Sequence, residues 1–152
     1  MSTSNLKPHL VADMKSTMKS GDKARLKVIR MILAAIKQVE VDERIELDDA
    51  RVIAVLDKMA KQRRESISQF EQAGRDDLAD VEKAELEVIQ HYLPEALTED
   101  EINRLIDAAI AETGASDMKQ MGQVMGTLKP RLQGRADMGQ VSQLIKARLG
   151  AH

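Results

Sequence analysis

The residues best suited to chemistry in this sequence are basic side chains around a turn near its end. In the run KPRLQGRAD (residues 129–137), the proline loosens the end of a helix, the glycine permits a left-handed turn, and the aspartate can cap the next helix. Arg131 and Arg135 flank this turn, where guanidinium groups can bind phosphate oxygens in a bidentate manner. The alternative is that both arginines only complement the negative end of the preceding helix.

Further basic residues surround this turn, because residues 118–152 hold six basic side chains and one acidic one. Gly122 and Gly126 form a GxxxG pattern within the expected helix, and each costs about 1 kcal/mol relative to alanine. Close packing against a neighbouring helix is the interpretation we favour, and close approach of a nucleic-acid backbone is the other. The candidate RNA-binding residues are Lys119, Gly122, Gly126, Lys129, Arg131, Gly134, Arg135, Lys146 and Arg148.

A secondary basic face lies in the first part of the chain, where residues 1–37 hold eight basic and two acidic side chains. Four of the basic residues fall within about 80° on a helix at 100° per residue. They are Lys23, Lys27, Arg30 and Lys37. Such a row is either a solvated outer surface or a line of phosphate contacts.

Two charged residues interrupt apolar helix faces and are expected to pair with each other. Arg63 lies between Met59 and Ile67, and Glu85 lies between Val81 and Ile89. If the glycine at position 74 marks a turn between two antiparallel helices, the two charges stand opposite each other. We predict a partly buried ion pair that keeps the two helices in register.

The sequence predicts no catalytic residue, no metal site and no cofactor. It has no cysteine, and His9, His91 and His152 are far apart along the chain. We find no zinc-protease motif, phosphate-binding glycine loop or nucleophile elbow. Activity as an enzyme by itself is therefore not expected.

Composition predicts an all-α protein that does not span a membrane. The 152 residues carry a net charge of −2, with one Phe, one Tyr and no Trp, and helix-forming residues dominate. No run approaches the roughly 18 apolar residues of a membrane span. The first residues lack the apolar core of a secretory signal, so a cytoplasmic protein is predicted.

Glycine and proline positions divide the chain into helical segments and two domains. Residues 1–94 form an N-terminal helical domain in which two long helices, before and after residue 74, make a hairpin. Residues 95–152 form a three-helix bundle that opens with a capping box at Thr98 and Glu101. One of its helices is expected to begin at Ser116 or Asp117.

Several motifs resemble the GatB/YqeY domain family, in particular its free-standing YqeY-like members. They are MGQVMG (residues 121–126), KPR (129–131) and GRAD (134–137), with RMILAAIK (30–37), KQRRESI (61–67), AGR (73–75) and YLP (92–94) in the first domain. The same domain forms the tail of the B subunit of the Asp/Glu-tRNA amidotransferase. The resemblance covers nearly the whole chain.

This resemblance implies a helical module that engages tRNA or another structured RNA, or that associates with an amidotransferase. A family label of carbon–nitrogen ligase with glutamine as amide donor can attach to such a chain, although no catalytic centre of that kind is visible. The alternative is a protein-interaction adaptor without RNA binding, which docks through acidic segments such as residues 38–50 and 76–87. A ligase whose centre is not apparent in the sequence is the third interpretation.

Overall fold

The computed structural model describes residues 5–150, which form seven α-helices, one short 3-10 helix and no strand. The prediction of an all-α protein is therefore confirmed. No helix in the described range is long and apolar enough to cross a membrane. The helices are α1 (Leu6–Ser20), α2 (Lys23–Glu43), α3 (Asp49–Gln72), α4 (Asp76–Tyr92), α5 (Glu99–Thr113), η1 (Met118–Gln120), α6 (Met121–Leu132) and α7 (Met138–Leu149).

The chain divides into two compact units, with the boundary between Leu93 and Pro94. The first unit contains α1 to α4, and the second contains α5 to α7 with η1. Each unit has its own cluster of buried apolar side chains.

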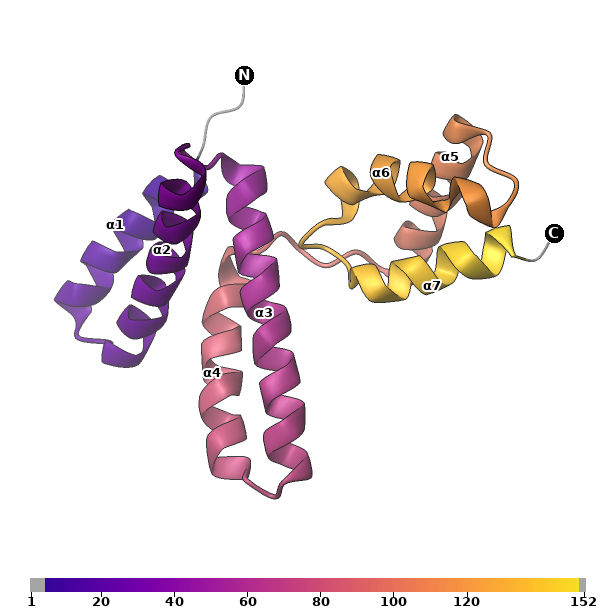
Figure 1. Ribbon diagram of the computed structural model, residues 1–152. Helices are drawn as coiled ribbons and strands as arrows, with labels where there is room; N and C mark the ends of the chain where they lie inside the picture. The colour runs from indigo at the N-terminus through magenta and orange to yellow at the C-terminus, as the bar shows by residue number, and fades with distance from the viewer. Residues whose placement is uncertain (1–4, 151–152) are drawn as a thin grey trace. The chain divides into compact units, whose positions relative to one another are not determined.

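In the first unit, consecutive helices run in opposite directions and lie side by side as α1 with α2 and α3 with α4 (Figure 1). Gly21, at φ +81°, ends α1 in the left-handed conformation that glycine adopts without strain. The Asp22 carboxylate then accepts the Arg25 backbone N–H and caps α2. The wide apolar face of α2 supplies much of the core, with Ile29 and Ile36 fully buried.

The second unit begins with the expected capping box, because Thr98 and Glu101 exchange side-chain to backbone hydrogen bonds at the start of α5. The start of the next helix differs from the prediction. Asp117 caps the 3-10 helix η1, and α6 begins only at Met121. The core of this unit is formed by fully buried residues of three helices: Ile106, Val124, Leu128, Leu132, Val141 and Ile145.

Candidate functional site

Gly122 and Gly126 lie on the exposed side of α6, opposite its buried residues Val124 and Leu128. A Cβ atom added at either glycine would meet nothing within 4 Å. The interpretation that they allow close packing against a neighbouring helix is therefore wrong for the helices of this unit. The missing side chains leave a bare strip of helix backbone that is open to a partner from outside.

Lys129 shares this exposed side of α6, because helical geometry places it within about 60° of both glycines. We call Gly122, Gly126 and Lys129 the glycine face. Lys119 on η1 and Lys146 on α7 are also exposed, and within residues 5–150 no ion pair involves any of these three lysines. Their charges thus remain available to an anionic ligand.

The two arginines of the predicted phosphate-binding turn have different surroundings. Arg131 approaches Glu112 of α5 at 3.5 Å, and both side chains are about half exposed, so this pair is weak. Arg135 donates from Nε to the Glu95 carbonyl at 3.2 Å, and its own carbonyl accepts the Leu97 N–H at 2.8 Å. Arg135 therefore connects the segment before α5 to the turn before α7 through hydrogen bonds.

Backbone geometry at this turn explains its glycine, since Gly134 has a φ of +79°. Pro130 lies inside α6, which continues to Leu132. The turn thus reverses the chain direction between α6 and α7, which both contribute buried residues to the core of the second unit. Gly134 has a conformational role here and needs no ligand to explain it.

Arg148 is joined to α5 rather than left free. Its guanidinium donates to the Asn103 carbonyl at 3.1 Å and to Asn103 Oδ1 at 2.9 Å, and it forms an ion pair with Asp107. These contacts connect the end of α7 to α5. Arg148 is thus engaged internally, and its structural role is evident without RNA.

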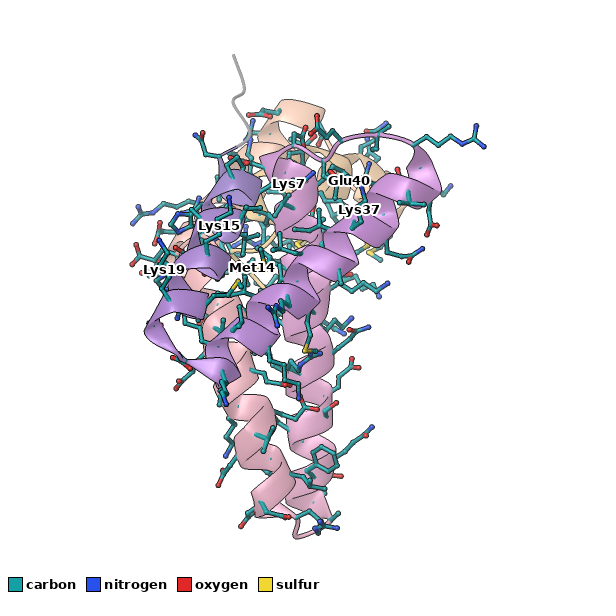
Figure 2. The ribbon with its side chains drawn as sticks, turned by 90° about the vertical axis from the view of Figure 1, so that its left-hand side faces the viewer. Lys7, Met14, Lys15, Lys19, Lys37 and Glu40 are labelled. Atoms are coloured by element: carbon teal, nitrogen blue, oxygen red, sulfur yellow. The ribbon has the colours of Figure 1, made fainter. Side chains whose placement is uncertain are left out.

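The secondary basic face on α2 is divided between two hollows. The larger, about 640 Å³, has an apolar floor and a basic rim and is lined by Lys23, Leu26, Lys27, Arg30, Met31 and Ala34. Lys37 lines a second hollow of about 360 Å³ together with Lys7 and Glu40. Figure 2 shows Lys37 on the same side of the molecule as Lys7, Lys15 and Lys19 of α1.

Glu40 is a buried acidic residue of α2 that the sequence analysis did not identify. Both of its carboxylate oxygens accept from Lys7 Nζ, at 2.8 and 2.9 Å (Figure 2), and one also accepts the Leu47 N–H at 2.9 Å. These contacts, led by the Lys7 hydrogen bond, lower the pKa of Glu40 below its usual value. Its spacing of four from Ile36 on the apolar side of α2 was the available signal.

Arg63 of α3 lies 3.1 Å from Glu85 Oε1 and 3.2 Å from Glu82 Oε2, both on α4. The pairing of Arg63 with Glu85 was predicted from the sequence, but the contact with Glu82 was not. It also placed Val81 on the inward side, whereas that residue is 56% exposed. Consecutive residues are rotated by 100° about the helix axis. Glu82 therefore faces α3, and the neighbouring Val81 faces solvent.

Comparison with known proteins supplies a family. A family model described as "Yqey-like protein" matches residues 7–149. Three relatives are each called "Altered inheritance of mitochondria protein 41, mitochondrial". The protein from Pyrenophora tritici-repentis is 35% identical over 147 residues, which cover 95% of this chain and 81% of the relative. The protein from Eremothecium gossypii is 41% identical, covering 56% of this chain and 47% of the relative. The protein from Meyerozyma guilliermondii is 31% identical, covering 77% and 67%.

The names of these relatives overturn one prediction from the sequence. Each is named as a mitochondrial protein, whereas the sequence analysis predicted a cytoplasmic one. The cytoplasmic prediction is therefore wrong. It rested on the missing apolar core of a secretory signal, and that criterion does not detect mitochondrial signals, which are amphipathic and rich in arginine.

Proposed function

Since this chain belongs to the YqeY-like family, we propose that it is an RNA-binding module that engages tRNA or another structured RNA through its second unit. The observation that carries this proposal is the glycine face. Two exposed glycines in a helix cost stability without filling any packing need in the unit. A ligand that approaches the helix backbone closely gives them a role.

The charges around the glycine face suit a phosphate backbone. Lys129 lies on that face, and Lys119 and Lys146 are exposed in the same unit. Phosphate contacts of this kind position RNA by its shape and charge. Stacking on bases plays little part, because the chain has one Tyr and one Phe, and the Tyr92 side chain is buried in the first unit.

The module would assist machinery that carries the chemistry elsewhere. The resemblance to the amidotransferase B subunit tail supports association with a glutamine-dependent carbon–nitrogen ligase, in which this chain would recognise RNA. We assign no catalytic residue to the chain itself. Any ligase activity would therefore belong to an assembly.

The test is the binding of fluorescently labelled bulk tRNA at several salt concentrations. We expect the logarithm of the binding constant to fall linearly with the logarithm of salt concentration, by about 0.7–0.9 for each phosphate neutralised. The Lys119→Ala/Lys129→Ala variant should bind more weakly and show a slope shallower by about 1.4–1.8. No binding at low salt would contradict the proposal.

A matched control separates local binding from general attraction to a polyanion. Lys58→Ala/Lys61→Ala removes two exposed lysines from α3 in the first unit, so the change in net charge is the same. We expect the affinity of this control to stay close to that of the unmodified chain. Equal losses in the two double variants would show that the attraction is diffuse and would reject the glycine face as the site.

A protein-interaction adaptor is the second candidate, and the larger hollow on α2 favours it. Its apolar floor with a rim of Lys23, Lys27 and Arg30 suits an acidic amphipathic helix of a partner protein. The variant Lys27→Glu/Arg30→Glu separates the two functions. It should abolish binding to such a partner and leave tRNA binding through the second unit intact.

A further inference from the structure

Two of the three histidines of this chain, remote in sequence, converge on one aspartate. His9 and Asp13 stand one turn apart on α1, and His91 lies near the end of α4, all within the first unit. One ligand atom from each side chain lies within 4.8 Å of the other two. Within this group, His9 Nε2 lies 3.3 Å from Asp13 Oδ2.

We propose that His9, Asp13 and His91 form a binding site for a divalent transition-metal ion, with Zn²⁺ as the best match. Two imidazoles and a carboxylate are ligands that zinc accepts, and three protein ligands leave a fourth position for water. Ligand atoms around tetrahedral zinc stand about 3.3–3.5 Å apart, given metal–ligand distances near 2.1 Å. Both histidines are exposed, so side-chain rotation can close the remaining gap.

A second feature supports the site, because the carboxylate is held by a buried tyrosine. The Tyr92 hydroxyl donates to Asp13 Oδ2 at 2.6 Å, and the Tyr92 side chain is only 4% exposed. A hydrogen bond of this kind orients a ligating carboxylate.

The aromatic ring of Tyr92 also lies beside both histidines. Its centroid is 5.7 Å from that of His9 and 5.1 Å from that of His91, both in edge-on arrangements. Arg25 donates to the Tyr92 hydroxyl at 3.3 Å, so a positive charge lies close to this arrangement. Its charge opposes cation binding, so we expect a moderate affinity.

Metal bound here would connect α1 to α4 and thereby stabilise the first unit. This proposal departs from the prediction of no metal site, which rested on the separation of the histidines along the chain. In the fold, the antiparallel helices bring the end of α4 close in space to the start of α1. The site is distinct from the glycine face, which belongs to the second unit.

The test is calorimetric titration of the untagged, metal-free full chain with ZnCl₂ at about pH 7.5. We expect about one equivalent to bind, and each of His9→Gln and His91→Gln to weaken binding at least about tenfold. His152→Gln is the matched control, since it removes the third histidine, and should bind as the unmodified chain does. Circular dichroism checks that every variant is folded.

Two further measurements test the coordination of the metal and the role of Tyr92. Co²⁺ should give visible absorption bands of a four-coordinate site, and Tyr92→Phe should weaken Zn²⁺ binding by about tenfold through loss of the hydrogen bond to Asp13. Zinc binding that survives both histidine substitutions would overturn the site. So would less than half an equivalent bound by the unmodified chain.

Discussion

Arg63 Nε lies 3.1 Å from Glu85 Oε1, and the two side chains are only 13% and 14% exposed. This pair joins α3 to α4, with a second carboxylate, Glu82, 3.2 Å from the same nitrogen. One cation thus faces two acids. Burial, together with the hydrogen bond to Glu85, raises the pKa of Glu82 above its usual value.

The substitution Glu82→Gln is expected to stabilise the fold at neutral pH. A carboxyl whose pKa is raised by folding contributes stability below its unfolded pKa, near 4.5, and loses that contribution as the pH rises through the folded value. Urea unfolding should therefore give a higher free energy of unfolding for Glu82→Gln than for the unmodified chain at about pH 7. This difference should shrink as the pH falls toward about 4. Glu87→Gln, at an exposed position of α4, should show no such trend.

Glu40→Gln is expected to act in the opposite direction. The contacts with Lys7 and Leu47 lower the pKa of Glu40, so its contribution is present above the unfolded value of about 4.5 and is lost as the pH falls through the folded value. The urea midpoint should fall on substitution at neutral pH and converge with that of the unmodified chain in acid. Glu46→Gln is the control. Glu46 also faces Lys7, but its side chain is 89% exposed and its contact with Lys7 Nζ is long, at 3.9 Å. A constant gap at all pH values would contradict the assignment.

Arg148→Ala is expected to destabilise the second unit by about 1–2 kcal/mol, because it removes the hydrogen bonds to Asn103 and the ion pair with Asp107. Arg148→Lys should not restore this stability, since lysine lacks the planar fork that reaches several acceptors. Lys146→Ala, which is exposed on the same helix, should change stability by less than about 0.5 kcal/mol. Thermal unfolding of the three variants measures these differences. If Lys146→Ala costs as much as Arg148→Ala, the internal contacts are not the cause.

Gly126→Ala is expected to separate stability from binding. The added methyl group meets no atom within 4 Å and removes a helix-destabilising glycine, so the free energy of unfolding should rise by up to about 1 kcal/mol. Affinity for tRNA should fall nonetheless, because the methyl group occupies the strip proposed for close approach. Gly126→Gln should reduce affinity further. Ala108→Gln, at an exposed position of α5, is the control for side-chain size. Unchanged tRNA affinity in both Gly126 variants would contradict the role of the glycine face.

Much of the local structure was predictable because its causes lie within a few residues. The left-handed turn at Gly21, the cap at Asp22 and the capping box at Thr98 follow from side chains that act on the adjacent backbone. The start of α6 was less predictable. Asp117 caps a helix there, but the first turn is a 3-10 helix. A side-chain cap acts in the same way on both kinds of helix.

The candidate site was only partly predictable, because a basic residue looks the same in sequence whether it faces solvent or a partner within the fold. Lys129 and Arg148 belong to the same basic segment. Lys129 is exposed, whereas Arg148 reaches across to Asn103 and Asp107. Which of the two is available to a ligand depends on how α7 packs against α5, and helical periodicity contains no information about that packing.

The sequence by itself determined the helical class, the caps and turns, the opposition of Arg63 to Glu85 and the resemblance to a family, since each depends on local spacing or shared motifs. The tertiary structure alone decided that Gly122 and Gly126 face outward, that Glu82 joins Arg63, and that His91 meets His9 and Asp13. The physical reason is that these relationships depend on helix rotation and packing. A rotation of 100° exchanges a buried neighbour for an exposed one, and helix packing brings residues together that are remote along the chain.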